Sequence, residues 1–325
     1  MKLGVILAAL AGLAVAAWLV IHVGFAAVLG AVAQVGWGGF AILCLYALGL
    51  FVILGSAWFS LMAGLPFPQL ATFIWGRIMR DAAGEVLPFS QFGGMLVGVR
   101  AVMLRGIAAP QAFASTIVDV TTEMMAQIVF ILTGLAIFLA RFGASGPLPG
   151  AALSGVVFVL TGSLAFIVLQ RRGFRFAEKL AARWFPGAAK RAQSFNQTIH
   201  DIYDTPSRLA LSSSVHLVGW FVSAGATWLA VRLIGGRIDI ASAIAIESVL
   251  CALRSAAILV PGALGVQEAG YAMLMPLFGL PAEIGLAASL LKRAREIAIG
   301  VPALLVWQAI EGRHALKTDT PVLEP

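Results

Sequence analysis

The segment from Ile258 to Gly270, with the sequence ILVPGALGVQEAG, constrains the fold more than any other part of the chain. It places a proline, three glycines and the polar pair Gln267–Glu268 inside a run that is otherwise hydrophobic enough for a membrane. Pro261 cannot donate a backbone hydrogen bond, and glycine adopts conformations that other residues avoid. A broken backbone survives in lipid only where protein covers it or water reaches it. We therefore predict a helical hairpin that dips into the bilayer, rather than one kinked spanning helix with a snorkelling Glu268.

Composition makes lipid the solvent for most of the chain. Of its 325 residues, 60% are hydrophobic and 11% are charged, a more apolar balance than that of a soluble domain. The two cysteines and four histidines are scattered, so we expect no disulfide framework, no metal and no cofactor. The basic residues behind the net charge of +7 lie beside membrane segments. This placement favours anionic phospholipid headgroups over nucleic acid as a partner.

Apolar runs divide the chain into membrane segments. We expect residues 3–21 to form a retained first helix, because the run is about as long as a full span and longer than a signal-peptide core. Asp119 and Glu123 lie four residues apart and therefore on one face of a helix. We expect further spans over residues 37–62, 151–169 and 209–234, and long helices over residues 111–142 and 283–310.

A second interrupted segment, residues 70–104, is built like the first. It is apolar but carries five charged residues around the sequence PFSQFGG at positions 88–94, so it cannot form one straight span. We predict a second re-entrant hairpin there. The turns of the two hairpins are assigned to Pro88, Gly93, Gly94, Pro261, Gly262 and Gly265.

One long polar stretch, residues 171–208, separates the membrane segments. Its aromatic and aliphatic residues recur at intervals of three and four among basic ones, with a break expected near Pro186–Gly187. That pattern is typical of helices in the headgroup plane and favours this arrangement over a solvated linker. By the positive-inside rule, this stretch and the C-terminal tail lie in the cytoplasm. Counting spans back from the stretch puts the N-terminus there too.

The two halves of the chain share a pattern. Pro88 and Glu123 recur 173 residues later as Pro261 and Glu296, and Gly-Ile at 106 aligns with Gly-Leu at 279. Each half also reads as two spans, a hairpin and a further span, in opposite orientation. Inverted repeats whose broken helices meet near the midplane are a transporter architecture. We predict an all-α polytopic membrane protein of two inverted repeats, residues 1–145 and 146–317, each with spanning helices plus a re-entrant helical hairpin, and a polar tail over 318–325.

Ionisable residues inside membrane segments each cost about 2.5–3.5 kcal/mol at the bilayer centre by insertion scales. Two explanations stay open: ion pairs that lock the halves together, and a polar cavity for a lipid headgroup. In such a cavity, Arg80, Arg254 and Arg295 would bind a phosphate or hydroxyls. We expect Arg254 or Arg295 to pair with Glu268. The candidate substrate-binding residues are Arg80, Asp81, Glu85, Gln91, Arg100, Glu123, Arg254, Gln267, Glu268, Arg295 and Glu296.

The sequence VPGALGVQE at 260–268 resembles the PGxLGxxE element of the lysylphosphatidylglycerol-synthase transmembrane-region family. Residues 85–101 resemble that family's first motif, LPxRxGExxRA, although Gln91 and Gly94 stand where the family often has Arg and Glu. The chain is most similar to the hopanoid-biosynthesis-associated subgroup (HpnL type). The resemblance implies a flippase-like protein that moves hopanoids or their derivatives from the inner towards the outer membrane. Larger members add a soluble aminoacyl-transferase domain, which we do not expect here.

These features predict a multi-pass protein of a bacterial inner membrane, with both termini cytoplasmic and room for a homodimer, that transports lipid and is not an enzyme. The sequence has no HExxH, GxSxG or Walker motif. Two alternatives stay open. One is a membrane-embedded lipid-modifying enzyme that uses Asp119 and Glu123 as an acid–base pair. The other is a non-transporting scaffold of hopanoid biosynthesis, which thorough pairing of the buried charges would favour.

Overall fold

The structure is a computed structural model that describes residues 25–86, 90–143, 161, 186–256, 263 and 265–318. In these residues it contains helices and no strands. The expected first helix, the expected span over 151–169 apart from residue 161, and the turn residues Pro88, Pro261 and Gly262 lie outside the described residues. The helices are α2 (Phe25–Ser60), α3 (Leu70–Val86), α4 (Ser90–Met103), α5 (Ala109–Phe142), α7 (Pro186–Tyr203), α8 (Pro206–Leu233), α9 (Ile240–Ala256), α10 (Val266–Leu274) and α11 (Ala282–Thr318), with short 3-10 helices η1 (Phe67–Gln69) and η3 (Met275–Phe278).

Three described helices are long and apolar enough to cross a membrane: Ala33–Ser60 within α2, Ala109–Phe142 and Pro206–Leu233. They agree closely with the spans predicted over 37–62, 111–142 and 209–234. Large apolar side chains of α2 such as Trp37 and Leu45 are 74% and 67% exposed. A soluble protein would bury such a continuous apolar surface, so lipid is its natural surroundings. The structure therefore confirms a helical membrane protein.

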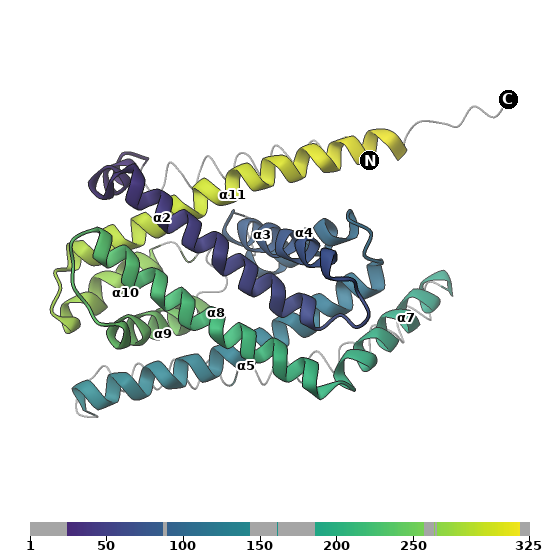
Figure 1. Cartoon of the computed structure of the whole chain (residues 1–325), viewed down its shortest axis with the longest axis horizontal. Coiled ribbons are helices and arrows are strands. Elements are labelled where there is room, and N and C mark those ends of the chain that lie inside the picture. The colour runs from purple at the N-terminus through teal and green to yellow at the C-terminus, as the bar shows by residue number, and fades with distance from the viewer. Residues whose placement is uncertain are drawn as a thin grey trace.

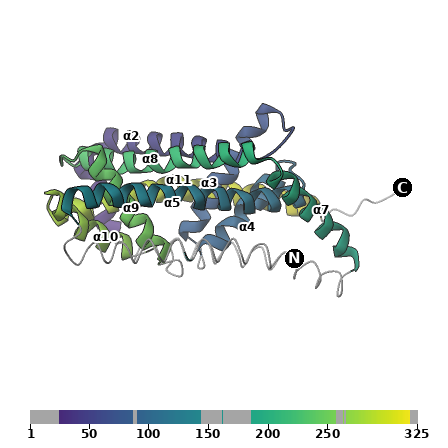
Figure 2. The same ribbon diagram turned by 90° about the horizontal axis from the view of Figure 1, so that it is seen from below.

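The helices form a bundle with two long helices at its edges. In Figure 1, α11 runs along the top and α5 along the bottom, and the colours show that they run in opposite directions. The α3/α4 pair and the α9/α10 pair lie between them, toward opposite ends of the long axis. Figure 2 shows α2 and α8 side by side along one face, with α4, α9 and α10 toward the other. This arrangement surrounds the interrupted segments with long helices.

The first interrupted segment is observed as two helices, α3 and α4, which pack along each other on either side of residues 87–89. The prediction that Gly93 and Gly94 form the turn is wrong, because both lie inside α4. A Cβ on Gly94 would come 2.4 Å from the carbonyl oxygen of Arg80, and one on Gly98 would come 2.9 Å from the Arg80 Cβ. These glycines serve the close approach of two helices, as small residues do in membrane proteins.

The second interrupted segment also consists of two packed helices, α9 and α10. Gly265, one of the predicted turn residues, precedes α10 with a φ of 78°, a left-handed value that glycine adopts readily. Ala263 also has a positive φ, of 47°. The backbone therefore leaves the helical conformation before Gln267, and α9 and α10 are separate helices.

Four apolar clusters among the described residues hold the bundle together, and two of them flank the charged side chains. Trp58 of α2 packs edge-on against Phe73 of α3, with ring centroids 5.3 Å apart, and its indole nitrogen donates to Ser115 Oγ of α5 at 3.0 Å. A larger cluster joins α8 to α11 around buried residues such as Met275 and Leu291. Together these contacts position the charged side chains that lie between them.

Candidate functional site

Buried charged side chains gather in three clusters inside the bundle. The α3–α5 cluster consists of Arg77, Arg80, Asp81, Asp119, Glu123 and His216. The Glu247 cluster consists of Thr227, Glu247, Tyr271 and Lys292. The Arg293 cluster consists of Glu85, Arg254, Glu268, Arg293, Arg295 and Glu296.

In the α3–α5 cluster, two arginines of α3 face two carboxylates of α5. Arg77 Nη2 lies 2.6 Å from Glu123 Oε1, and Arg80 lies 2.7 Å from Asp119 Oδ2 and 2.5 Å from Glu123 Oε2. Spacings of three residues on α3 and four on α5 place each pair on one helix face. The structure thus confirms that Asp119 and Glu123 share a face. Arg77 also pairs with Asp81, one turn further along α3.

The Glu247 cluster joins four helices through one carboxylate. Lys292 of α11 lies 2.9 Å from Glu247 Oε1 of α9. The hydroxyls of Thr227 on α8 and Tyr271 on α10 donate to Glu247 Oε2 at 2.5 and 2.7 Å. Every charge in this cluster is therefore hydrogen-bonded as well as paired, which a buried ion pair requires.

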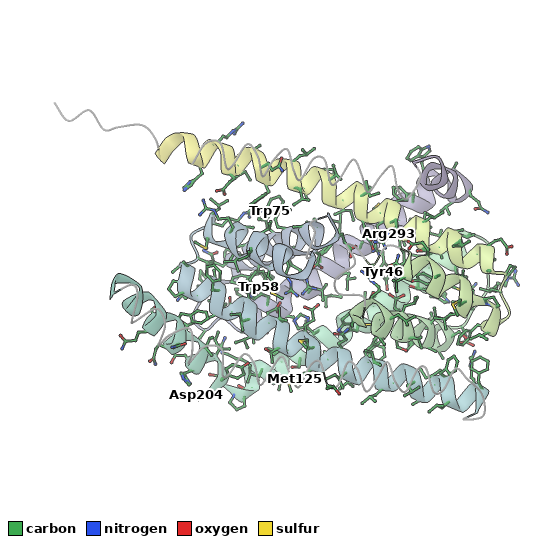
Figure 3. The ribbon with its side chains drawn as sticks, turned by 180° about the vertical axis from the view of Figure 1, so that it is seen from behind. Tyr46, Trp58, Trp75, Met125, Asp204 and Arg293 are labelled. Carbon is green, nitrogen blue, oxygen red and sulfur yellow. The ribbon has the colours of Figure 1, made fainter. Side chains whose placement is uncertain are left out.

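The Arg293 cluster connects the two interrupted segments. Glu85, near the end of α3, accepts from Arg254, near the end of α9, at 2.8 Å and from Arg293 at 3.1 Å. Arg293 Nε also donates to Glu268 Oε1 of α10 at 3.2 Å. The other oxygen of Glu268 accepts from the backbone N–H of Gly265 at 2.8 Å. Figure 3 places Arg293 on α11, facing the interior of the bundle.

Glu268 has a different partner from the one that the sequence predicted. Neither Arg254 nor Arg295 contacts it in the described structure, and its guanidinium partner is Arg293. The reason lies in the face of α11: Ser289, one turn before Arg293, donates to the same Glu268 oxygen at 3.2 Å. Arg295 lies off this face and pairs with Glu296 at 3.1 Å.

The predicted site residues are brought together in part. Arg80, Asp81 and Glu123 meet in the α3–α5 cluster. Five other candidates meet around Arg293: Glu85, Arg254, Glu268, Arg295 and Glu296. Gln267 is buried beside that second group and donates to Ser289 Oγ at 3.1 Å. Arg100 lies apart and pairs with Glu311 at 2.7 Å. The side chain of Gln91 lies outside the described part of the structure.

Several residues of the clusters were missing from the predicted site. Arg77 precedes Arg80 by three residues, and this same-face spacing could have indicated it. His216 and Thr227 are isolated polar residues in an apolar span, eleven positions or about three helical turns apart. That spacing puts both on one face of α8 and could have indicated them as well. Tyr271 gave no comparable signal, since a buried tyrosine in an apolar helix is common.

Among the described residues, no group of three or more His, Cys, Asp or Glu is arranged to hold a metal ion. Two buried polar atoms in or beside the clusters lack a hydrogen-bond partner: Gln267 Oε1 and His216 Nδ1. Such atoms are costly to bury, so each marks a position where a donor would be bound favourably.

One known protein family matches most of this chain. The family model described as Lysylphosphatidylglycerol synthase TM region matches residues 4–303, a range that includes both interrupted segments and all three clusters. No curated protein and no solved structure matches the chain.

Proposed function

Because the chain belongs to the lysylphosphatidylglycerol synthase transmembrane-region family, which is membrane-embedded and associated with lipid handling, we propose that it moves a lipid between membrane leaflets. We propose further that the lipid is a hopanoid or hopanoid derivative, moved from the inner towards the outer membrane of a bacterium. The protein would lie in the inner membrane with both termini in the cytoplasm. The resemblance to the hopanoid-associated subgroup supports this substrate.

The observation that carries the proposal is the meeting of the two interrupted segments at Arg293. Glu85 from the first segment and Glu268 from the second both accept from this one guanidinium, which is 1% exposed. Polar backbone breaks that converge inside a membrane bundle are how transporters build a substrate site near the midplane. A structural protein would have no need to place two such breaks together.

Helix bounds support the inverted repeat that this proposal uses. α2 and α8 end at Ser60 and Leu233, and α5 and α11 begin at Ala109 and Ala282; each pair is separated by the predicted 173 residues. Gly106 and Gly279, at the same separation, have φ values of 94° and 79°. The members of the α5/α11 pair run in opposite directions in Figure 1. We infer from these matches that two copies of one helical unit face opposite sides of the membrane.

Hydrogen-bonding capacity favours a hydroxyl-rich headgroup over a phosphate. Arg80, Arg254 and Arg295 were candidates for binding phosphate, but each lies against a carboxylate. A phosphate would have to displace that carboxylate. The buried Gln267 Oε1 has no donor, and a hydroxyl could supply one directly. This pattern supports the polyol headgroup of a hopanoid derivative as the substrate.

The rival functions make different use of the same residues. Pairing of the charges is the observation that favours a scaffold. A lipid-modifying enzyme would need Asp119 or Glu123 to exchange protons with substrate, whereas guanidinium groups hold both carboxylates. We therefore rank the scaffold above the enzyme as the second candidate.

The decisive experiment measures hopanoids in separated inner and outer membranes of a hopanoid-producing strain that lacks this gene. The proposal expects hopanoids to accumulate in the inner membrane, with total hopanoid content unchanged, and the wild-type gene to restore the distribution. A fall in total content instead would support the scaffold. New or missing hopanoid structures would support the enzyme.

A further inference from the structure

His216 is a buried histidine with one ring nitrogen bonded and the other without a partner. It lies on α8 and is 0% exposed. Its Nε2 lies 2.9 Å from Asp119 Oδ1, whereas Nδ1 has no hydrogen-bond partner among the residues that the structure describes. A carboxylate accepts hydrogen bonds, so Nε2 carries the hydrogen in the neutral ring and Nδ1 carries a lone pair. A basic nitrogen is thus held, already oriented, with nothing bound to it.

The net charges of the three clusters differ, and only the cluster that contains His216 is not balanced. The Glu247 cluster holds one cation and one anion, and the Arg293 cluster holds three guanidinium groups and three carboxylates. The α3–α5 cluster holds two guanidinium groups and three carboxylates. With a neutral His216 the cluster therefore carries one excess negative charge. The Asp81 side chain is 30% exposed and that of Asp119 is 0% exposed, so a proton on His216 beside Asp119 would balance the charge where burial makes it most unfavourable.

Groups on the neighbouring helices leave His216 as the position for that proton. His216 faces Asp119 of α5, and Glu123 lies one turn further along that helix. The charged residues of α3 reach His216 only indirectly: Arg77 and Arg80 pair with these carboxylates, and Asp81 pairs with Arg77. Tyr46 of α2 donates instead to the Val222 carbonyl. Glu247 of α9 and Lys292 of α11 bond Thr227, about three turns along α8. On α7, which precedes α8, His200 and Asp201 are exposed.

We propose that His216 is a proton-binding site, with Nδ1 as the accepting atom and Asp119 as the partner of the imidazolium, and that lipid movement is coupled to it. The proton comes from water on one side of the membrane and returns to water on the other, so the Nδ1–H bond is the one that forms and breaks. His216 and Arg80 bind different oxygens of Asp119, Oδ1 and Oδ2, so an imidazolium does not displace Arg80. A proton on Nδ1 would instead cancel the excess negative charge between α3, α5 and α8 and strengthen the contact of these helices. The coupling rests on the proposed function, whereas the proton site does not.

The proton site is tested directly by nitrogen-15 spectroscopy of histidine-labelled protein in lipid nanodiscs. The chain has four histidines, so the signal lost in His216→Gln identifies His216. Glutamine can still donate to Asp119 but cannot take up a proton. We expect the Nδ1 signal of His216 to change from the unprotonated to the protonated form when the sample is taken from basic to acidic buffer. A signal that is the same in both buffers would overturn the proposal.

The coupling is tested in liposomes that contain the purified protein and a hopanoid with a vicinal-diol side chain. Periodate added outside cleaves the outward-facing diols and so measures the leaflet ratio. With one proton per lipid, a gradient of one pH unit corresponds to about 1.36 kcal/mol and can drive this ratio up to about tenfold. We expect the gradient to shift the ratio in the wild type and in His200→Gln, a matched substitution at an exposed histidine, but not in His216→Gln.

The outcomes separate the two proposals. Lipid movement that ignores the gradient in the wild type would overturn the coupling. A wild type that moves no hopanoid under any gradient would contradict the proposed function, and the titration of His216 would then decide the proton site alone. A gradient response retained in His216→Gln would assign the proton to another residue and overturn the role of His216.

Discussion

At the scale of single residues, Glu268 and Asp119 carry the same charge in different surroundings. The Asp119 side chain is 0% exposed and pairs with both Arg80 and His216, whereas the Glu268 side chain is 20% exposed. Arg293, the partner of Glu268, also contacts Glu85 and Glu296. Loss of charge at Glu268 therefore leaves its partner paired, and loss at Asp119 does not leave Arg80 equally well compensated.

We predict that Glu268→Gln folds and accumulates like the wild type but does not restore the outer-membrane hopanoid level of the deletion strain. Asp119→Asn serves as the comparison, because breaking a buried pair costs about 3–5 kcal/mol and should lower abundance. Immunoblots of membranes report abundance, and hopanoid analysis reports function. An abundant and fully active Glu268→Gln variant would remove Glu268 from the site.

The Glu247–Lys292 pair gives a second prediction at this scale. Lys292→Met leaves Glu247 buried without its cation and should destabilise the protein by about 3–5 kcal/mol. Adding Glu247→Gln removes the stranded charge and should recover most of that loss. Thermal unfolding in detergent measures both variants against the wild type. A double variant no more stable than the single one would show that Lys292 contributes through packing instead.

Sequence spacing predicted which residues share a helix face but not which partner they meet across helices. The four-residue spacing of Asp119 and Glu123 was enough to place both toward one neighbour. The partner of Glu268 depended on how α11 is rotated about its axis and shifted along it, and no local pattern encodes these quantities. The spacing of His216 from Thr227 could have placed both on one face of α8, but it could not have indicated Asp119 of α5 as the partner of His216.

At the scale of helices and their connections, glycine serves either a turn or a close contact between two helices, and sequence alone does not distinguish these roles. Gly93 and Gly94 read as a turn because they follow a proline and a serine. The structure places them in α4, where Gly94 lies against the backbone of α3 at Arg80. Helix bounds were predicted more closely where an apolar run ends next to a glycine with a positive φ, as α5 does at Gly143 and α8 does near Gly235.

We predict that Gly94→Val separates α3 from α4 and destabilises the protein by about 1–3 kcal/mol, the usual cost of overpacking. Since Gly94 lies beside Arg80, the α3–α5 cluster should be disturbed as well. Gly49→Ala on α2 is the control, because a Cβ there meets nothing within 4 Å. Thermal unfolding in detergent should show a loss for Gly94→Val and none for Gly49→Ala.

The connection before α9 provides a pH-dependent prediction outside the spanning helices. Asp239 pairs with Arg141 at the end of α5 and accepts from the backbone N–H of Ser242 at 2.7 Å. The hydrogen bond from Arg141 is the main cause that lowers the pKa of Asp239 below its ordinary value. A lowered folded-state pKa stabilises above the unfolded-state pKa, and this contribution is lost as the pH falls through the folded-state pKa.

Asp239→Asn should therefore lower stability at pH 7 by less than about 1 kcal/mol, because the pair is exposed and screened by solvent. Asparagine keeps the capping geometry, so the charge alone is removed. The difference from the wild type should shrink as the pH is lowered below about 3.9, the ordinary aspartate value. Unfolding curves at pH 7 and at acidic pH measure it. A difference that stays constant with pH would assign the effect to the cap instead.

At the scale of the whole molecule, the membrane topology remains a prediction. Ser194 is exposed on α7, within the basic stretch, and Arg237 is exposed beyond the other end of α8. Since α8 is long and apolar enough to cross a membrane, we expect these two positions on opposite sides of it. The basic stretch predicts that Ser194 lies on the cytoplasmic side.

Ser194→Cys should react with an impermeant thiol reagent only from the cytoplasmic side, and Arg237→Cys only from the outside. Both changes are made after Cys44 and Cys251 are replaced by alanine, so that a single thiol is present. Labelling of Ser194→Cys from outside would reverse the topology. Labelling of both variants from one side would contradict a spanning α8 and, with it, the inverted repeat.

Hydrophobic runs were sufficient to predict the three long apolar helices among the described residues, because the bilayer requires such helices. They could not predict how the buried charges divide into three clusters. That division depends on how the helices of each half are brought together, and contacts such as Glu85–Arg254 join residues 169 positions apart. Long-range pairing of this kind leaves no local trace in the chain.

Some matched positions of the two halves carry opposite charges, and this bears on direction. Asp81 and Asp119 correspond, 173 residues later, to Arg254 and Lys292, whereas Glu123 and Glu296 keep the same charge. If the chain is the inverted repeat that we propose, two identical halves would make the inward-open and outward-open arrangements mirror one another and equal in free energy. The opposite charges at the first two positions would then make the two arrangements differ in energy and in population. We expect such a protein to rest facing one side of its membrane, so that a lipid arriving from that side finds it open.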